Sequence, residues 1–488
     1  MSLAWLNRAS LLIFRKKAWL HAALVLFTSA SIFRAEPVIG QGFTNLHNFV
    51  FTNGTYPLAS LIMSGTTLYG TAQNYGGGTG GGYGSVFKMG IDGSNFTALH
   101  IFSGGTDGGN LNGSLVSANG KLYGTATFGG GLNYGCVFGI STNGTGLINL
   151  YNFSVPSTNS PYTNGDGTYP VCGLIFSGST LYGMANGGGS AGVGNIFAVN
   201  TNGAGFTNLH SFNVSDGQYP AANLILSGST LFGMTPGGGA FHSGNIFSVS
   251  TNGTGFTDLF NFPPTSGVLF SNSDGAFPQG SLLLSGGTLY GTASEGGSAG
   301  NGTVFRIDTN GAAFSVLHTF SVTSGALGTN SDGASPDAEL ILSDGVLYGT
   351  AKYGGSGGSG TVFRLNTDGT GFATLYSFTA ADAVTGTNRD GAHPVSGLIL
   401  SGGNLYGTAS RGGTAGYGTV FSLLVPPVLN IQLSGTNVVL TWPTNMTGFS
   451  LQTTTNLSPP VVWSALGGQY SVTNPVTSKQ RFFRLIHP

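Results

Sequence analysis

The chain has 488 residues, of which 86 are glycine and only 6% are charged, and its formal net charge is −1 at pH 7. An ordinary soluble domain has about 25% charged residues, and phosphate binding needs a basic stripe that the repeats described below do not have. We therefore expect no nucleic-acid partner. Regularly spaced apolar residues, within 40% hydrophobic content, argue against a disordered chain.

The N-terminal residues have the order of a secretory signal. Arg8, Arg15, Lys16 and Lys17 precede an apolar run over residues 18–33, and small residues lie at its end. This run is shorter than the ~20 residues that a membrane-spanning helix needs. We therefore expect residues 1–35 to be a cleaved signal peptide, with no transmembrane segment after cleavage and a secreted or cell-surface location.

A Leu-aromatic-Gly-Thr/Met step recurs seven times at spacings of 50 to 59 residues. Its aromatic members are Tyr69, Tyr123, Tyr182, Phe232, Tyr290, Tyr348 and Tyr406. Such a period indicates a repeat architecture. In the unit around Tyr290, four apolar runs over residues 278–284, 288–293, 304–307 and 314–320 are separated by Gly-rich or Asn-Gly turns, which is typical of a four-stranded propeller blade. We call these strands A, B, C and D.

The two ends of the array predict how the ring closes. A strand D motif at Gly42 to Phe49 comes before any strand A, whereas the last unit stops after strand C at Val420 to Leu423. Pairing these two segments leaves no orphan edge. The sequence therefore predicts an all-β fold, a seven-bladed β-propeller of ~58-residue repeats over residues 40–424, closed by an N-terminal strand.

The repeat units, for example over residues 288–293, 302–305 and 367–372, resemble the Gloeo/Verruco-type tandem repeat of secreted bacterial "choice-of-anchor" proteins. The resemblance extends from about Gly42 to Leu423. It implies a secreted or surface location and a variable C-terminal attachment module. It implies no catalytic residue.

The C-terminal residues 429–488 differ in composition from the repeats. Three segments, Val438 to Trp442, Phe449 to Thr453 and Arg481 to Ile486, are predicted strands, and the Leu-Thr-Trp-Pro step resembles a small fibronectin-like β-sandwich. Two hypotheses stay open for this part, a sorting or attachment module and a capping domain.

An Asp-Gly step precedes strand A in six units, at Asp107, Asp166, Asp216, Asp274, Asp332 and Asp390. The remaining unit has Asn53-Gly54 at this position. We expect these residues to ring one mouth of the central channel, where carboxylates could bind Ca²⁺. The favoured interpretation is structural, because Asp accepts backbone N–H bonds in a turn that Gly completes, and Asn53 can do the same.

One position of strand D has a side chain with a flat ring in all seven units. It is histidine in four units, at His47, His100, His210 and His318, and tyrosine or phenylalanine in the other three, at Tyr151, Phe260 and Tyr376. Because any flat ring is accepted, the position predicts packing between blades rather than a zinc site, whose ligands must converge. Cys136 and Cys172 fall in neighbouring units. Two buried thiols and one disulfide between blades are both open.

The residues of the B-to-C loops differ between units, whereas the flanking strands are alike. Variable loops on a rigid scaffold are where binding specificity usually lies. Ligand-face candidates are Tyr75, Phe128, Glu295, Lys352, Tyr353 and Arg411. The sequence shows neither the converging carboxylates of a glycosidase nor a nucleophile elbow. We expect a non-catalytic protein, without a cofactor other than Ca²⁺, that binds an extracellular glycan or protein. The alternatives are an extracellular polysaccharide hydrolase or lyase and a purely structural envelope protein.

Overall fold

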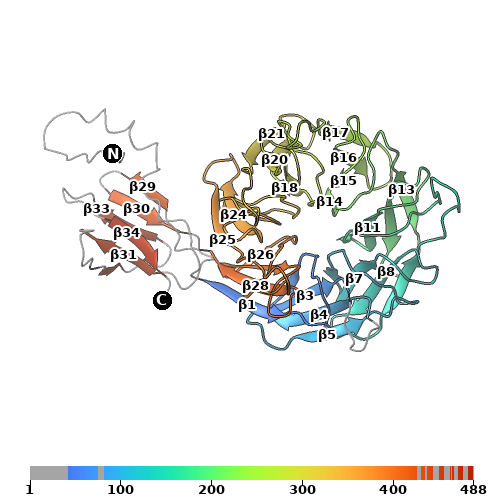
Figure 1. The fold of residues 1–488 in the computed structure, drawn as a ribbon, viewed down its shortest axis with the longest axis horizontal. Coiled ribbons are helices and arrows are strands. Elements are labelled where there is room, and N and C mark those ends of the chain that lie inside the picture. The colour runs from blue at the N-terminus through green and yellow to red at the C-terminus, as the bar shows by residue number, and fades with distance from the viewer. Residues whose placement is uncertain are drawn as a thin grey trace. The chain divides into compact units, whose positions relative to one another are not determined.

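The computed structural model describes residues 42–74, 82–425, 430–434, 437–442, 450–455, 462, 464–466, 471–475 and 482–486. In these residues all regular structure is β-strand. Seven four-stranded antiparallel sheets form the blades of a ring (Figure 1), which confirms the predicted seven-bladed propeller. The predicted signal peptide, residues 1–35, lies outside the described residues. Across the described part, no helix has the length and hydropathy of a membrane span.

Each of the first six blades consists of four consecutive strands, with the short strand A innermost and strand D outermost (Figure 1). From A to D, these strands are β2 (Ile62–Ser64), β3 (Thr67–Ala72), β4 (Ser85–Gly90) and β5 (Thr97–Ile101) in blade 1; β6 (Val116–Ala118), β7 (Lys121–Ala126), β8 (Cys136–Ser141) and β9 (Ile148–Asn152) in blade 2; β10 (Ile175–Ser177), β11 (Thr180–Ala185), β12 (Asn195–Asn200) and β13 (Thr207–Ser211) in blade 3; β14 (Ile225–Ser227), β15 (Thr230–Thr235), β16 (Asn245–Ser250) and β17 (Thr257–Asn261) in blade 4; β18 (Leu283–Ser285), β19 (Thr288–Ala293), β20 (Thr303–Asp308) and β21 (Ser315–Thr319) in blade 5; and β22 (Ile341–Ser343), β23 (Val346–Ala351), β24 (Thr361–Asn366) and β25 (Ala373–Ser377) in blade 6.

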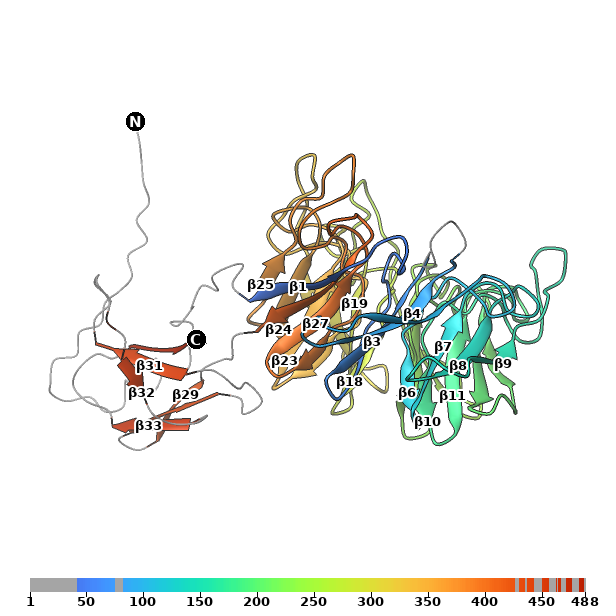
Figure 2. The same ribbon diagram turned by 90° about the horizontal axis from the view of Figure 1, so that it is seen from below.

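Blade 7 is built from both ends of the array. Its strands are β26 (Ile399–Ser401), β27 (Asn404–Ala409), β28 (Thr419–Leu424) and, as the outer strand, β1 (Phe43–Asn48). The two outer strands pair antiparallel from Phe43 opposite Leu423 to Asn48 opposite Thr419. Figure 2 shows the blue β1 among the orange strands that come last in the ring. The predicted closure is confirmed.

The glycine of the repeated motif is required by a phenylalanine of strand C. In blade 5, Gly291 of β19 lies opposite Phe305 of β20, and a Cβ on Gly291 would lie 2.5 Å from Cζ of Phe305. Phe305 is fully buried. The same Gly and Phe pairs occur in the other blades: Gly70 and Phe87, Gly124 and Phe138, Gly183 and Phe197, Gly233 and Phe247, Gly349 and Phe363, and Gly407 and Phe421.

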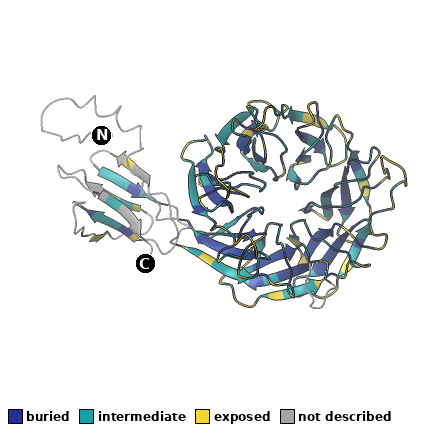
Figure 3. Cartoon of the chain, viewed as in Figure 1, coloured by how far each residue is buried: buried dark blue, intermediate teal, exposed yellow. Residues whose placement is uncertain are grey.

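The hydrophobic core lies between blades as well as within them. Phe262, which follows the outer strand of blade 4, packs with Leu289 and Phe305 of blade 5 in one buried cluster. Equivalent clusters join the other neighbours, and Figure 3 shows buried residues running through the strands of the ring. Complete burial of such a side chain stabilises the fold by about 1.5–3 kcal/mol, so contacts with a neighbouring blade contribute to the stability of every blade.

Strand A is shorter than predicted. In the unit around Tyr290 the predicted strand begins at Pro278, whereas β18 begins at Leu283. Phe277 has a left-handed backbone, with φ of 53°, and Pro278 has no N–H to donate to a ladder. The residues between Pro278 and Leu283 instead follow the central channel.

The C-terminal part contains two three-stranded sheets. One is β29 (Asn430–Ser434), β30 (Asn437–Thr441) and β33 (Ser471–Pro475), and the other is β32 (Ser464–Leu466), β31 (Ser450–Thr454) and β34 (Phe482–Ile486). Leu440, Trp442 and Leu451 form its buried centre. The three predicted strands correspond to β30, β31 and β34. The fibronectin-like classification and the role in sorting or attachment stay predictions.

Gly291→Ala tests the Gly and Phe pairing. We expect the variant to lose about 1–3 kcal/mol of unfolding free energy, because the new methyl group overlaps the buried Phe305 ring. Urea denaturation followed by circular dichroism measures this loss. Gly165→Ala is the control, since a Cβ there meets no atom within 4 Å. Equal stability of the two variants would contradict the role of the motif glycine.

Candidate functional site

The D-to-A and B-to-C loops emerge on one face of the ring, which we call the loop face. In every blade one residue of the D-to-A loop forms an antiparallel β-bridge with one residue of the B-to-C loop, which confirms that the two loops share a face. The bridges are Thr55 with Asn74, Gly109 with Phe128, Thr168 with Gly187, Gln218 with Gly237, Ala276 with Glu295, Ala334 with Tyr353, and Ala392 with Arg411.

Four of the ligand-face candidates occupy the same structural position. Phe128, Glu295, Tyr353 and Arg411 are the B-to-C members of these bridges, and all four are exposed. Lys352 precedes Tyr353 and is half-buried, with its ammonium 5.2 Å from the centre of the Tyr353 ring. Tyr75 lies outside the described residues. The variable loop residues are therefore arranged in a ring at one register of the repeat.

The next residue of each D-to-A loop has a left-handed backbone, a feature that the sequence analysis missed. These residues, with φ between 51° and 57°, are Tyr56, Asn110, Tyr169, Tyr219, Phe277, Ser335 and His393. In six blades the following residue is proline, which disfavours helical backbone angles in the residue before it. Each N–H is held by a carbonyl in the preceding blade's B-to-C loop at 2.6–3.0 Å. A recurrent aromatic-Pro step was the available signal.

Side chains of the bridge position and of the left-handed position meet between neighbouring blades. The rings of Phe128 and Tyr169 have centroids 5.2 Å apart, and those of Tyr353 and His393 are 5.0 Å apart. The Arg411 guanidinium lies 5.2 Å from the centre of the Tyr56 ring. The loop face thus contains aromatic clusters at several blade junctions. Burial, with the charges of Arg411 and Lys352, lowers the pKa of His393 to about 4, so this ring is neutral at pH 7.

The Asp-Gly residues connect one blade to the next. The Asp332 carboxylate accepts hydrogen bonds from His318 Nε2 at 3.2 Å, from the Ser321 N–H at 3.0 Å and from the Ser321 hydroxyl, all at the outer strand of blade 5. Its backbone carbonyl accepts the hydroxyl of Thr361 in blade 6 at 3.0 Å. Burial alone would raise the pKa of Asp332, but the hydrogen bonds from His318 and Ser321 outweigh it and the pKa is lowered.

The same arrangement recurs with changed partners. Tyr151 donates to Asp166 and Tyr376 donates to Asp390, and Asn53 accepts the Val50 N–H in the blade that lacks the acid. Asp107 and Asp216 are bonded by His100 and His210. Asp274 differs, because Phe260 and Pro263 stand where blade 5 has His318 and Ser321, and neither can donate a hydrogen bond to the carboxylate.

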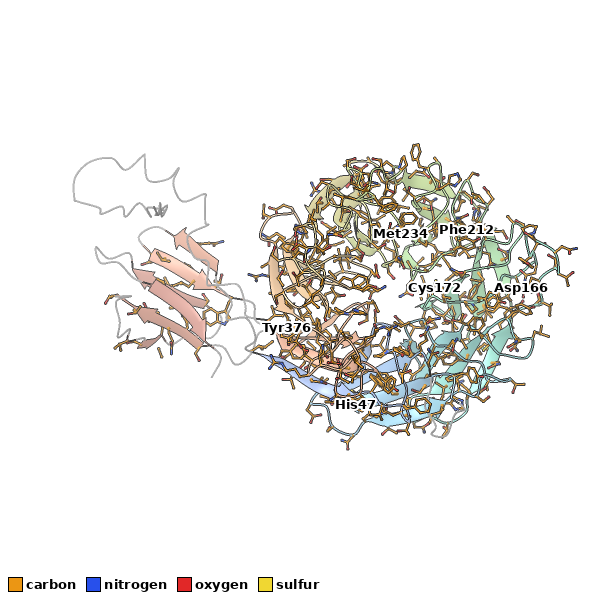
Figure 4. All side chains as sticks on the ribbon, in the orientation of Figure 1. His47, Asp166, Cys172, Phe212, Met234 and Tyr376 are labelled. Carbon is orange, nitrogen blue, oxygen red and sulfur yellow. The ribbon has the colours of Figure 1, made fainter. Side chains whose placement is uncertain are left out.

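The expected ring of Asp carboxylates around the channel mouth is wrong. The carboxylates bond to the outer strand D, and Figure 4 shows Asp166 toward the periphery of the ring, far from the central opening that Cys172 approaches. The Asp-Gly turn does not specify the direction of the Asp side chain, which is decided by the contact with the preceding strand D. Among the described residues, no three His, Cys, Asp or Glu side chains are placed to hold a metal ion.

The histidines of strand D pack between blades. His47, His210 and His318 stack on Phe96, Phe256 and Phe372 of the next blade, with centroids 3.6–3.8 Å apart. Tyr151, Phe260 and Tyr376 stack in the same way. This geometry agrees with the packing interpretation and separates the imidazoles by whole blades.

Both cysteines are free and buried. The Cys136 thiol donates to the Asp107 carbonyl at 3.8 Å, which is the contact that Thr361 makes in blade 6, and the Cys172 thiol donates to the Pro220 carbonyl at 3.5 Å. Burial raises the pKa of Cys136 to about 12 and raises that of Cys172 further. The structure therefore contains two inert thiols and no disulfide between them.

The propeller contains a groove between two blades and a cavity in its central channel. A groove of about 630 Å³ between blades 4 and 5 is lined by strand residues of blade 4, among them Ser227 and Phe232, and by the A-to-B turn of blade 5 at Gly286. Ser248 of blade 4 also lines it, at a position where blades 5 and 6 have arginines. Its lining has no titratable side chain. A cavity of about 90 Å³ lies in the central channel and is lined by Asp337 and Glu339 among residues of all seven blades. Burial raises the pKa of both carboxyls.

Comparisons with known proteins identify the repeat. A family model described as the Gloeobacter/Verrucomicrobia repeat matches residues 28–165, 160–331 and 265–431. No curated protein sequence matches the chain.

Solved structures with a similar fold include an oligogalacturonate lyase from Vibrio parahaemolyticus, at 9% identity and a TM-score of 0.49, covering 79% of this chain and 93% of the lyase. They also include PorZ, a surface component of the type-IX secretion system of Porphyromonas gingivalis, at 12% identity and a TM-score of 0.47, covering 90% of this chain and 60% of PorZ. At these identities and scores the likeness carries no argument about function.

Asp332→Ala tests the connection between blades. We expect a loss of about 2 kcal/mol in unfolding free energy, because two buried donors of Ser321 and one of His318 lose their partner. Asp274→Ala is the matched control and should cost about 0.5 kcal/mol or less, since its carboxylate lacks those donors. The difference between the two should be the same with Ca²⁺ and with a chelator. A difference that disappears on chelation would favour the cation hypothesis instead.

His47→Phe tests the pH dependence of the closure strand. Burial lowers the pKa of His47 to about 4, whereas an unfolded histidine titrates near 6.5. The unfolded chain therefore binds more protons between these values, and stability falls as the pH drops through this window. Phenylalanine fits the position, as Phe260 shows. When the pH is lowered from about 7 to about 4, we expect the melting temperature of the variant to fall less than that of the parent. Identical losses would contradict the role of this histidine.

Proposed function

Because the chain belongs to the Gloeobacter/Verrucomicrobia repeat family and folds as a closed propeller, we propose that it is a non-catalytic binding protein whose loop face holds the ligand. The placement of exposed large hydrophobic side chains supports this proposal most strongly. Among the described residues nineteen are exposed, and all but Ile101, Ile148 and Val462 lie in D-to-A or B-to-C loops. The other sixteen therefore belong to the loop face.

The apolar loop tips differ between blades. The loop between blades 4 and 5 exposes Val268 (94%), Leu269 and Phe270, and the loop between blades 6 and 7 exposes Val384 (93%). Monomeric soluble proteins rarely expose contiguous apolar patches of more than about a few hundred Å², and patches above that size mark interaction sites. Variable apolar tips on a constant ring are the expected arrangement for a protein that selects a partner by its loops.

The partner that we propose is an extracellular glycan or protein. Aromatic rings supply flat apolar surfaces with polar edges, and the junction clusters place Arg411 and Lys352 beside such rings. Secretion or surface display is part of the proposal and rests on the order of charged, apolar and small residues over positions 1–35.

The described carboxyls support a non-catalytic role. The carboxylates of Asp166, Asp332 and Asp390 are occupied by donors of the outer strands. Asp337 and Glu339, whose pKa values are raised, face a cavity of about 90 Å³. Ligand pockets usually measure about 300–1,000 Å³, so this pair lacks room for a sugar ring. The alternative function, a hydrolase or lyase, would need another pair of carboxyl groups.

A triple variant, Phe128→Ala with Tyr353→Ala and Arg411→Ala, tests the loop face. We expect at least about a tenfold loss of affinity, because aromatic and Arg anchors dominate protein interfaces. Binding of the labelled chain to a glycan array and to cell-envelope fractions provides the measurement. The control is Ile101→Ala with Ile148→Ala, which removes exposed side chains from outer strands and should leave binding unchanged.

Two outcomes would contradict the proposal. Release of reducing sugar or of unsaturated products from a polysaccharide would establish an enzyme. Failure of the parent protein to bind any glycan or envelope fraction would favour the structural envelope protein.

A further inference from the structure

The central cavity is lined by residues two to four positions after the left-handed residue of the D-to-A loops. Most blades place small or neutral side chains there, whereas blade 6 places Asp337 and Glu339. The neutral polar members include Asn112, Gln279 and Asn223. The described lining has oxygen-bearing side chains and no imidazole or thiol group.

The wall of the cavity is held by hydrogen bonds between blades. The Ser281 hydroxyl accepts the Asn223 N–H at 2.9 Å, and the Ser60 hydroxyl accepts the Gly397 N–H at 2.9 Å. Glu339 extends toward blade 7, since a Cβ on Gly397 would lie 2.8 Å from Glu339 Oε1. The ring of blades therefore fixes the positions of these oxygen atoms before any ligand binds.

Asp337 has one satisfied and one unsatisfied oxygen. Its Oδ2 pairs with Lys352 Nζ at 3.3 Å, and its side chain is only 11% exposed. Its Oδ1 is buried and has no hydrogen-bond partner. An unpartnered buried carboxylate oxygen is unfavourable, because it loses its hydrogen bonds to water without gaining a partner. Glu339 lines the same cavity and is buried, with a hydrogen bond to Ser281 of blade 5, whereas Lys352 pairs with Asp337.

We propose that this cavity binds a hard divalent cation, of which Ca²⁺ is the best fit, through Asp337 and Glu339 with neutral oxygens from neighbouring blades. Ca²⁺ takes 6–8 oxygen ligands in flexible geometry, whereas Mg²⁺ demands a near-ideal octahedron that an irregular ring of seven blades does not provide. Sites without nitrogen or sulfur suit hard cations. A cavity of about 90 Å³ accommodates an ion with water, since one water occupies about 30 Å³.

A bound cation explains two features together. It supplies a partner for Asp337 Oδ1, and it offsets the burial that raises the pKa of both carboxyls. It also joins blade 6 to its neighbours at the centre of the ring, where the Asp-Gly contacts do not reach. The ion is therefore expected to stabilise the closed ring without contacting the loop-face ligand.

Calorimetric titration of the chelator-treated full chain with CaCl₂ tests the site. We expect one Ca²⁺ per chain and a melting temperature higher with millimolar Ca²⁺ than with chelator, since a ligand of the native state alone stabilises it. Glu339→Gln and Asp337→Asn should each weaken binding at least about tenfold. The matched control is Asp344→Asn in an exposed turn of the same blade, which should bind as the parent does.

Location is checked separately. Crystals soaked with Sr²⁺ should show anomalous density in the central channel. The inference fails if the parent takes up no Ca²⁺, or if the Asp337→Asn and Glu339→Gln double variant, folded by circular dichroism, binds with unchanged affinity. It also fails if Asp332→Ala abolishes Ca²⁺ binding in a folded chain, because the ion would then belong to the Asp-Gly position.

Discussion

The pairing of β1 with β28 closes the ring, and the packing of every blade requires this closure. Every blade buries its strands against the next one, so an array with a free end would expose a complete hydrophobic surface at that end. The strand from Phe43 to Asn48 prevents this by completing blade 7, and Phe43 itself stacks on Tyr376 of blade 6 at 4.1 Å. Closure also creates the two features that a single blade cannot have, a central channel and a continuous loop face.

A constant backbone with changing side chains explains how one repeat serves different purposes. The Asp-Gly step, the left-handed residue and the β-bridge recur around the ring. The left-handed residue bonds to the preceding blade through its backbone N–H, and most of the Asp residues bond to it through their carboxylates. The side chains at the bridge and channel positions can therefore change from blade to blade, although Ser60 and Ser281 in the channel also bond to a neighbouring blade. They vary from Gly237 to Arg411 at the bridge and from Val395 to Asp337 in the channel. The candidate binding residues therefore lie at positions where the repeats differ in sequence.

Sequence reasoning located some of these positions and misplaced others. Phe128, Glu295, Tyr353 and Arg411 stood out as variable residues, and the structure gives them one common register. The Asp-Gly residues were correctly tied to a turn but were placed at the channel. Their direction depends on His318, Tyr376 and the other residues of strand D, which precede them in the chain and lie on the outer edge. The repeat period in the sequence does not show whether the side chain of a turn residue is directed toward the central channel or toward the outer strand of a blade.

The repeat, the number of blades and the closure can be predicted from the amino-acid pattern, because they follow from local features: alternating strands, Gly turns and a strand D motif without its own strands A to C. The tertiary structure alone decided the assembly of side chains from separate blades. Asp337 and Glu339 are ordinary acids in the sequence, and they line a common cavity only because segments from all seven blades enclose it. Burial depends on what surrounds a residue in space, and no single repeat contains that information.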